Sequence, residues 1–314
     1  MLGQRIIDGH SHIGIDWTWE LQGKLAEYLK YAKALDITDS FLMPTPMPVL
    51  RLGKCEVVPV TLGDYGTKKI ILQGIQDSKG LRGTLINQNP YTYANMILYQ
   101  QIASCNTDIR LHFVPLVHPI FDTINYLELL ILCFKPIALK VHGYSCIMSP
   151  QNISYDFWKL VQYYKIPLII HTDCDTSSEK TLDSFYRNEN SPFAWIQLLL
   201  QYNIRAYLTH GIRLCPDSCR IVNESNNFIV GLGPDKLLST TKDRLYSNDS
   251  YLDTLFSMVD SDKICFDLDY PWNTQSYDNL EYDWNSLNRL KALGLTDSQL
   301  QNVLYKNISN FYGL

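Results

Sequence analysis

The segment Arg5–His12, RIIDGHSH, is a short apolar run followed almost directly by two histidines. The same arrangement returns further along the chain, where Pro167–His171 reads PLIIH and Arg205–His210 reads RAYLTH. Each apolar run is too short for a helix and has the length of a buried strand. The repetition predicts several buried strands that end in polar side chains.

Eight short apolar runs alternate with longer amphipathic segments along the chain. Strands are predicted at residues 5–8, 40–43, 111–117, 137–141, 167–171, 205–209, 228–231 and 264–269. Helices are predicted at residues 23–35, 125–134, 155–164, 192–202, 284–293 and 297–311. Buried strands with intervening helices are typical of parallel βαβ units. The pattern predicts an α/β fold and favours a (β/α)8 TIM-like barrel, in which functional residues lie at the C-terminal ends of the strands.

An open doubly wound sheet is the alternative architecture. It would require a glycine-rich phosphate loop after the first strand, whereas residues 9–14 read GHSHIG. Two β-rich runs around Gly63–Gly66, within residues 55–77, indicate a β-hairpin that interrupts the alternation. We therefore expect one domain, residues 1–314, with an insertion at about 50–90 after the second strand. The hairpin either covers the barrel mouth as a lid or lies in solvent.

The composition is that of a globular protein with ample apolar material for a core. The 314 residues are 46% hydrophobic and 19% charged, and the formal net charge is −5. This acidic balance gives no sign of nucleic-acid binding. No run reaches the roughly 18 apolar residues of a membrane helix, and Arg5 and Asp8 stand where a signal peptide would be apolar. The scattered cysteines form no CxxC pair, so we expect a cytoplasmic protein with reduced thiols.

Polar side chains stand at the ends of four predicted strands, where a barrel has its functional rim. His10 and His12 are two residues apart, so on a strand they face the same way. His171 and His210 each follow an apolar run, and Asp269 ends the run ICFDLD at 264–269. Two imidazoles make half of a tetrahedral metal site, and a buried carboxylate needs a hydrogen bond, a charge partner or a metal. One such residue is typical of a core, but the set predicts a metal site.

In their order along the chain, these pieces resemble the amidohydrolase superfamily, and specifically the amidohydrolase-related branch that includes aminocarboxymuconate semialdehyde decarboxylase and many metal-dependent hydrolases. The ordered series is specific and spans nearly the whole chain. The matching segments are IIDGHSHIG at 6–14, FVPLVHP at 113–119, ALKVHGY at 138–144, PLIIHTD at 167–173, LTHG at 208–211, FDLDYPW at 266–272 and GLTDSQLQNVLYKNISNFYGL at 294–314. The resemblance implies a metal-dependent enzyme that acts on a small-molecule substrate.

The resemblance also implies a role for each strand-end residue. His10, His12 and His171 would bind one divalent metal ion, zinc in the first place, with manganese or iron as alternatives. Asp269 would contact the metal and shuttle a proton. His210 would be catalytic, polarising the substrate or orienting the nucleophile, and in relatives with two metals it binds the second ion. The ion would lower the pKa of a bound water molecule toward neutrality.

Lys140 and His142 face the same way on the predicted strand at 137–141, and each has two interpretations. Some binuclear relatives carboxylate a lysine at this place to bridge two metals. Alternatively, Lys140 acts as a base with a lowered pKa or as an electrostatic group. His142 either contacts the substrate or supports a neighbouring residue by a hydrogen bond. The two remaining histidines, His112 and His118, are expected to be structural.

Three further residues are candidates for substrate binding, and one aspartate departs from the family's pattern. Arg213, in HGIR at 210–213, either binds a substrate carboxylate or lies in solvent. Trp17 and Trp272 follow the first and last strands and either wall an apolar pocket or pack under the rim. Asp267 stands where relatives commonly have a small residue, and Lys140 is a candidate partner for its carboxylate.

Three functions follow from this site. The first is metal-dependent hydrolysis of an amide, a lactone or a cyclic C–N bond, with Asp269 as proton shuttle. The second is non-oxidative decarboxylation of a carboxylic acid, which uses the same ligands. The third is a catalytically inactive barrel that serves as a binding module. The sequence identifies no substrate, and a homodimer is one assembly that such barrels commonly form.

Overall fold

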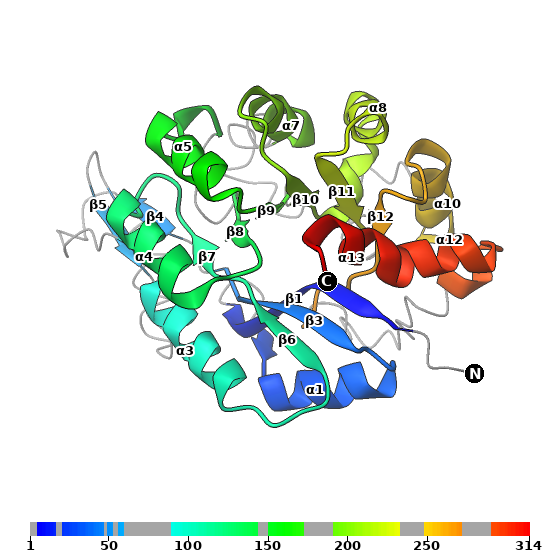
Figure 1. Cartoon of the computed structure of the whole chain (residues 1–314), viewed down its shortest axis with the longest axis horizontal. Coiled ribbons are helices and arrows are strands. Elements are labelled where there is room, and N and C mark those ends of the chain that lie inside the picture. Colours follow the sequence, from blue (N-terminus) through cyan, green and yellow to red (C-terminus); the bar gives the residue numbers. More distant parts are fainter. Residues whose placement is uncertain are drawn as a thin grey trace.

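The computed structural model describes residues 5–16, 21–46, 49–52, 56–59, 89–143, 150–172, 191–232, 248–271 and 290–314. Helices lie around the outside of the strands, as expected for an α/β fold (Figure 1). The strands are β1 (Ile7–Asp16), β2 (Leu21–Gly23), β3 (Asp39–Pro44), β4 (Val49–Leu52), β5 (Glu56–Pro59), β6 (Arg110–Phe113), β7 (Leu116–Val117), β8 (Leu139–Val141), β9 (Leu168–Ile170), β10 (Ala206–Leu208), β11 (Phe228–Gly231) and β12 (Ile264–Cys265).

Most of the described helices stand between successive strands, and α12 and α13 follow the last of the described strands. The helices are α1 (Leu25–Ala34), α3 (Thr92–Ala103), α4 (Ile124–Phe134), α5 (Tyr155–Tyr164), α7 (Pro192–Gln201), α8 (Pro216–Glu224), α10 (Asn248–Met258), α12 (Asp297–Gln301) and α13 (Asn307–Tyr312). Shorter turns are η1 (Pro150–Asn152), η2 (His210–Leu214) and the π-helical η3 (Asn302–Lys306), which joins α12 to α13. Among the described helices, none has both the length and the apolar content needed to cross a membrane.

The strands form two parallel sheets and a separate pair. One sheet has the order β2-β1-β3-β6 and the other β12-β11-β10-β9-β8-β7, and only β2 runs antiparallel to its neighbour. β4 and β5 pair antiparallel within the expected insertion. The predicted hairpin turn at Gly63–Gly66 lies outside the described residues. The α/β class with parallel sheets is therefore confirmed.

The two sheets are linked at two places. At one place, β6 and β7 follow each other in the chain, separated only by Val114 and Pro115. The single predicted strand at 111–117 is divided here because proline has no backbone N–H to donate to a ladder. At the other place, three backbone hydrogen bonds join β1 to the segment after β12: Gly9 N to Phe266 O at 3.1 Å, Asp269 N to His10 O at 2.8 Å, and His12 N to Tyr270 O at 2.7 Å.

Buried apolar side chains divide into two groups on the two faces of the strands. On β9, Leu168 and Ile170 belong to the outer group beneath the helices, whereas Ile169 between them belongs to the inner group. The inner group draws on both sheets and on α13: Ile7, Phe41, Met43, Val114, Ala138, Ile169, Tyr207, Ile229, Cys265, Ile308 and Phe311. One face of β1, β3, β9, β10, β11 and β12 therefore points into a common core.

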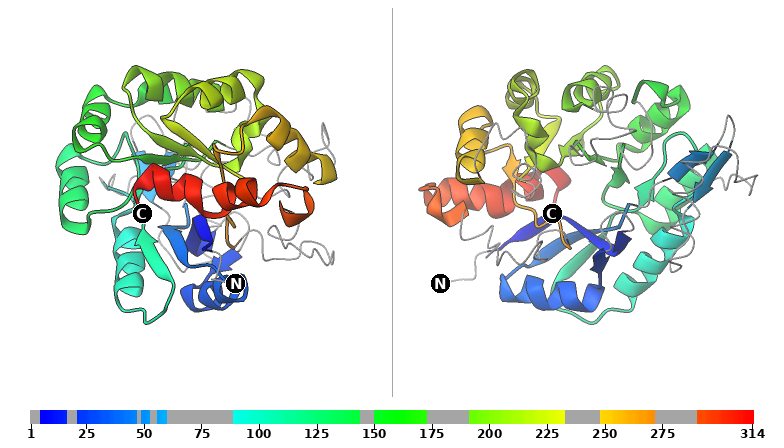
Figure 2. Two further views of the ribbon diagram at one scale, coloured as in Figure 1. Left: turned by 45° about the vertical axis from the view of Figure 1, so that its right-hand side comes forward. Right: turned by 180° about the vertical axis from the view of Figure 1, so that it is seen from behind.

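The C-terminal segment closes one end of this inner core, as its position in red beside the strands in Figure 2 shows. A capping box begins it, because Gln299 N donates to Thr296 Oγ1 at 3.3 Å while Thr296 N donates to Gln299 Oε1 at 3.0 Å. Phe266 N donates to Val303 O at 2.9 Å and ties the segment to the strands. The predicted closing helix at 297–311 is confirmed, with a π-helical turn in its middle.

Candidate metal and catalytic site

His10 and His12 reach the inner face through an irregularity in β1. Ile7 points into the inner core, so strict alternation along the strand would turn both histidines outward. The pairing of β1 with β3 shifts between Asp8 and Ser11. An extra residue of this kind reverses the faces that follow, and such bulges are common beside active sites. The shift brings both imidazoles inside.

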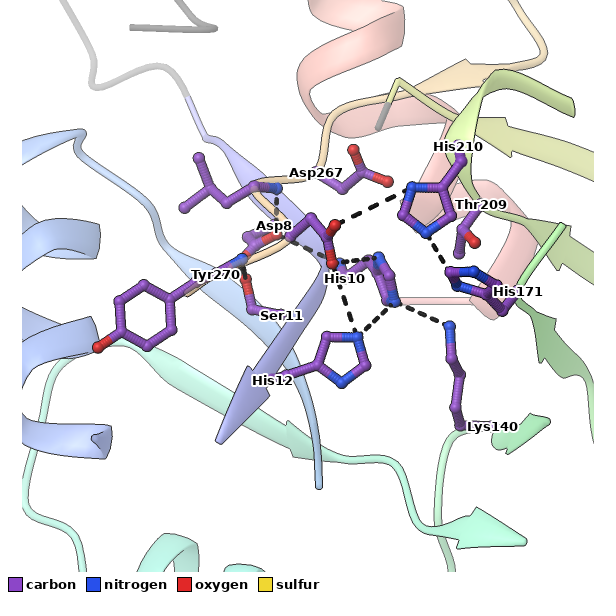
Figure 3. Close-up of polar contacts among 12 residues, drawn as sticks. Asp8, His10, Ser11, His12, Lys140, His171, Thr209, His210, Asp267 and Tyr270 are labelled. Atoms are coloured by element: carbon purple, nitrogen blue, oxygen red, sulfur yellow. Dashed lines mark hydrogen bonds and ion pairs between the residues drawn. The ribbon is translucent and has the colours of Figure 1, made fainter. Parts of the chain in front are cut away.

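His10 and His12 lie beside Lys140 at the centre of the site (Figure 3). Asp269 is in contact with both histidines. His10 Nε2 lies 2.9 Å from His12 Nε2 and 2.8 Å from Lys140 Nζ. Asp269 Oδ1 lies 3.4 Å from His10 Nδ1 and 3.6 Å from His12 Nε2. All four side chains are buried. His10, His12 and Asp269 each offer one ligand atom, and these atoms lie within 4.8 Å of one another.

His210 connects His171 to this group. Its Nε2 lies 3.0 Å from His171 Nδ1, and its Nδ1 lies 4.0 Å from Asp269 Oδ2. His142 stacks on His171, with ring centroids 3.8 Å apart and an interplanar angle of 25°. His171 therefore lies beside the three converging ligands, with His210 between it and Asp269, and His142 supports its ring.

Two residues of the site have a left-handed backbone. His210, two residues after the end of β10, has a φ of +57°, and Asp269, after β12, has a φ of +51°. Outside glycine, this conformation costs on the order of 1–3 kcal/mol and is found where the surroundings enforce it, often at functional sites. The turns aim the two side chains at each other across the strand ends.

A backbone carbonyl fixes the tautomer of His12. Its Nδ1 lies 3.1 Å from Pro44 O, and because a carbonyl only accepts hydrogen bonds, Nδ1 carries the proton. The lone pair of the neutral ring then lies on Nε2, which faces His10 and the carboxylate of Asp269. Burial, and after it the charge of Lys140, lower the pKa of both His10 and His12. Both rings are therefore neutral, the form that binds metal ions.

The residues of the site fit a divalent cation. In the described part of the chain, His10 Nδ1 and His210 Nδ1 are buried without a hydrogen-bond partner, although both face the oxygens of Asp269. The lone pair of His12 points into the same space. A cation between these groups would satisfy donor atoms that are otherwise costly to bury. Two imidazole nitrogens and a carboxylate oxygen are a donor set typical of zinc.

Lys140 is fully buried against His10. Burial lowers its pKa to about 7, although the negative charges of Asp269 and Asp267 act in the opposite direction. Lys140 Nζ therefore either donates to His10 Nε2 as an ammonium group or accepts from it as a neutral amine. Its carboxylation stays a prediction.

Asp267 lies deeper on the same face of the chain as Asp269, as the spacing of two predicts. Its Oδ2 accepts a hydrogen bond from Tyr207 Oη at 2.7 Å. A Cβ at Gly231 would collide with this carboxylate, so the absence of a side chain there makes room for it. Tyr207 is thus a hydrogen-bonding partner of Asp267. Lys140, the partner suggested by the sequence, is close enough for the negative charge of Asp267 to raise the pKa of the lysine.

Asp8 is a buried residue of this region that the sequence reasoning missed. Its carboxylate accepts hydrogen bonds from Ser11 Oγ and Tyr28 Oη, both at 2.6 Å, from His10 N at 3.2 Å and from Leu268 N at 3.0 Å. Burial raises its pKa, and the hydrogen bonds offset part of that shift. The available signal was its place in the apolar run before the two histidines.

The remaining candidates lie away from the centre or outside the described residues. His112 Nε2 lies 3.4 Å from Asp39 Oδ1 on the opposite side of the inner core, and His118 N donates to Asp122 Oδ2 at 2.8 Å. Both contacts suit the structural roles expected of these histidines. Trp17, Trp272 and the side chain of Arg213 fall outside the described part of the chain.

Neither family models nor curated proteins give a match to this sequence. Solved structures do. A 5-carboxyvanillate decarboxylase from Sphingomonas paucimobilis has a TM-score of 0.63 at 10% identity, covering 99% of this chain and 100% of that one. The chain shares its fold.

Two more structures agree with this result. A 5-carboxyvanillate decarboxylase from Novosphingobium aromaticivorans with bound manganese has a TM-score of 0.59 at 10% identity, covering 99% of this chain and 98% of that one. A probable 2-pyrone-4,6-dicarboxylic acid hydrolase from Acinetobacter baumannii with bound citric acid has a TM-score of 0.57 at 14% identity, covering 98% and 99%. The resemblance inferred from the sequence is thereby confirmed at the level of the fold.

Proposed function

We propose that this protein is a metal-dependent enzyme of the amidohydrolase type that hydrolyses an amide, a lactone or a cyclic C–N bond in a small molecule. One observation carries the proposal: His10, His12 and Asp269 converge within 4.8 Å in a buried site. Its position agrees, because Asp269 lies beyond the C-terminal end of β12 and its turn is hydrogen-bonded to the part of β1 that carries the two histidines. Enzymes of this architecture carry their chemistry at the C-terminal ends of the strands.

The proposal takes the two sheets as the wall of a single (β/α)8 barrel that forms one domain. Three backbone hydrogen bonds between β1 and the segment after β12 support this, as does the inner core shared by both sheets. Such a wall has its N-terminal end covered by α13, and the substrate would reach the site from its C-terminal end.

His10, His12 and Asp269 would hold the ion, with His171 as the fourth ligand that the sequence suggests. Zinc suits two or three imidazoles with one carboxylate, and manganese is the alternative. A divalent ion in this place supplies Lewis acidity and makes water acidic enough to ionise near neutral pH.

The chain's own groups handle protons and orientation. Asp269 takes the proton of the attacking water and returns it to the leaving group, since its two carboxylate oxygens lie among the nitrogens of three histidines at the centre of the site. His210, whose Nε2 contacts His171, orients the substrate carbonyl. As a neutral amine, Lys140 accepts a hydrogen bond from His10 Nε2, and this tautomer leaves the lone pair of His10 on Nδ1, which faces Asp269.

Non-oxidative decarboxylation is the second candidate. Two of the three similar structures are described as 5-carboxyvanillate decarboxylases, and the third is described as acting on a dicarboxylic acid. Lys140, buried in the same site, offers a positive charge to a carboxylate substrate. A catalytically inactive binding module has less support, because it would have no use for the five polar groups His10, His12, His171, His210 and Asp269.

Metal binding tests the site directly. We expect wild-type protein to take up one equivalent of zinc or manganese, and His12→Ala to bind at least about 100-fold more weakly, because it loses a direct ligand. His112→Ala is the matched control, since that histidine contacts Asp39 elsewhere and should leave affinity unchanged. Calorimetric titration with elemental analysis measures both. Uptake of much less than one equivalent by the wild type, or full metal affinity in His12→Ala, would contradict the proposed metal centre.

Labelled water separates the two reactions. The metal-loaded protein is given cyclic amides, lactones and aromatic carboxylic acids in water labelled with heavy oxygen or deuterium, and the products are analysed by mass spectrometry. Solvent oxygen in the product supports hydrolysis. Deuterium on carbon together with released carbon dioxide supports decarboxylation. Loaded protein that binds these compounds without converting any of them favours the binding module.

A further inference from the structure

Asp269 holds an unfavourable backbone conformation without a regular strand around it. Its φ is +51°, and β12 ends four residues earlier, at Cys265. A non-glycine residue in this region costs on the order of 1–3 kcal/mol and persists only where its surroundings over-determine it. The contacts that enforce the turn therefore decide where the carboxylate points.

Side chains of β1 hold the backbone N–H groups of the residues before and after Asp269. Leu268 N donates to Asp8 Oδ1 at 3.0 Å, and Tyr270 N donates to Ser11 Oγ at 3.3 Å. These two amides come directly before and after the left-handed residue. A relaxation of the turn to negative φ would reorient both of them and break these bonds.

Backbone contacts complete the attachment. The amide of Asp269 donates to His10 O at 2.8 Å, and the amide of His12 donates to Tyr270 O at 2.7 Å. The strand that carries the two histidines and the turn that carries the carboxylate are thus bound to each other at consecutive residues. Of the four hydrogen bonds described here, those of Asp8 and Ser11 are made by side chains, so substitution can remove them without changing the backbone.

Asp8 is itself held in place. Besides Leu268 N, its carboxylate accepts hydrogen bonds from His10 N, Ser11 Oγ and Tyr28 Oη. An ionised carboxylate has about four acceptor positions, so these four donors use them all. Asp8 and Tyr28 are both fully buried. The Asp8 carboxylate therefore links β1, α1 and the turn after β12 by hydrogen bonds.

We propose that Asp8 and Ser11 are positioning residues that hold Asp269 in its left-handed conformation and set the distance from its carboxylate to the imidazoles of His10 and His12. They touch neither metal nor substrate in this scheme and act through Asp269. The inference rests on the proposed metal centre, which gives that distance its importance.

Cobalt binding to the full-length protein tests the proposal, because the visible spectrum of cobalt reports the geometry of its ligands. Ser11→Ala removes the hydroxyl that accepts from Tyr270 N, and Asp8→Asn weakens the hydrogen bonds that the side chain of residue 8 accepts. Both variants should bind cobalt about 10–100-fold more weakly than wild type, the usual effect of losing a group that orients a ligand. Their absorption bands should also shift. Ser11→Thr keeps the hydroxyl and should restore both affinity and spectrum.

Asp39→Asn is the control for a loss of general stability. Asp39 is also a buried carboxylate, with donors in Thr38, Arg5 and His112, but it lies at the opposite end of the inner core. This variant should lose stability and keep the cobalt spectrum and affinity of wild type. An equal loss of affinity in Asp39→Asn would show that stability, and not positioning, explains the effect.

Amide hydrogen exchange of the metal-free protein gives a second readout. Ser11→Ala should speed the exchange of the Tyr270 amide and leave the amides of β10 unchanged. Unaltered cobalt binding and exchange in Ser11→Ala and Asp8→Asn overturns the proposal. Failure of the wild type to bind cobalt overturns the metal centre instead, and the exchange data then decide whether these side chains hold the turn.

Discussion

Asp267 and Asp269 point to the same side of one short segment, yet their surroundings differ. The oxygens of Asp269 lie 3.4 to 4.0 Å from nitrogens of three histidines. Asp267 accepts a hydrogen bond from the hydroxyl of Tyr207. A carboxylate among imidazole nitrogens serves a cation, whereas one bonded to a phenol is already satisfied by a neutral donor.

Amide substitutions at these two positions should therefore have unequal effects. Asp269→Asn removes the anionic ligand and the proton acceptor, so we expect intact folding, much weaker zinc binding and no turnover. Asp267→Asn keeps an oxygen for Tyr207, so its zinc affinity should stay within about threefold of wild type, a small difference for one retained hydrogen bond. Competition titration with a chelator measures both affinities. Equal losses in the two variants would contradict the assignment of Asp269.

The sequence predicts part of this site because alternation along a strand is a local property. It placed Lys140 with His142, and Asp267 with Asp269, on common faces. It gave no sign of the bulge that turns His10 inward, since a bulge has no fixed sequence pattern. Asp8 was missed for another reason. Two of its partners, Tyr28 and Leu268, are 20 and 260 residues away in sequence, so their contact exists only in the folded chain.

At the scale of elements, Asn95 of α3 joins a helix to the edge of a sheet. Its Nδ2 donates to Leu116 O, and its Oδ1 accepts from Leu116 N, both at 2.9 Å. The side chain thereby takes the place of a neighbouring strand for β7, at the edge where Pro115 interrupts the ladder. Asn95 is buried, so water does not replace these bonds.

Asn95→Ala should destabilise the protein by about 2–3 kcal/mol, because it leaves both polar groups of Leu116 buried and unpaired. Gln100→Ala, an exposed position on the same helix, is the matched control and should change the unfolding free energy by less than about 0.5 kcal/mol. Urea unfolding followed by circular dichroism measures both. A loss no larger than that of the control would mean that β7 does not depend on Asn95.

Helix prediction succeeded for α1, which has no side-chain cap, and for three helices whose sequence carries one. α4, α5 and α7 begin at Thr123, Ser154 and Ser191, whose hydroxyl oxygens accept from the backbone three residues later. α3 was not predicted: it begins at Tyr91 without a side-chain cap, and it contains no charged residue to mark a polar face. α8, α10 and β2 were also missed. Short elements without such markers are fixed by tertiary packing more than by local sequence.

Across the whole molecule, polar groups collect at both ends of the inner core. Opposite the histidine site, Asp39 of β3 lies 3.2 Å from Arg5, and 3.4 Å from both Arg110 and His112 of β6. Arg5 also donates to Tyr305 Oη at 2.7 Å in the C-terminal segment. The α/β class and most of the strands followed from the sequence. This charge cluster did not, because its members are brought together only when the first and last segments meet.

The cluster should make stability depend on pH in the acid range. Burial raises the pKa of Asp39, but hydrogen bonds from His112, Thr38 and Arg5 and the charge of Arg110 outweigh it and lower the value to about 2, from 3.8 in the unfolded chain. Folding therefore favours the ionised form. The resulting stabilisation is present above pH 3.8 and is lost as the pH falls toward 2.

Asp39→Asn removes this contribution and tests its sign. At pH 7 the variant should be less stable than wild type by about 1–2 kcal/mol, and the difference should shrink as the pH falls, because the wild-type carboxyl becomes protonated as well. Urea unfolding of both proteins from neutral to acid pH measures the difference. Asp36→Asn, at an exposed position three residues earlier, controls for the loss of one negative charge. A difference that persists unchanged at the lowest pH would mean that Asp39 contributes through packing, since a purely electrostatic contribution must vanish once the carboxyl is neutral in both states.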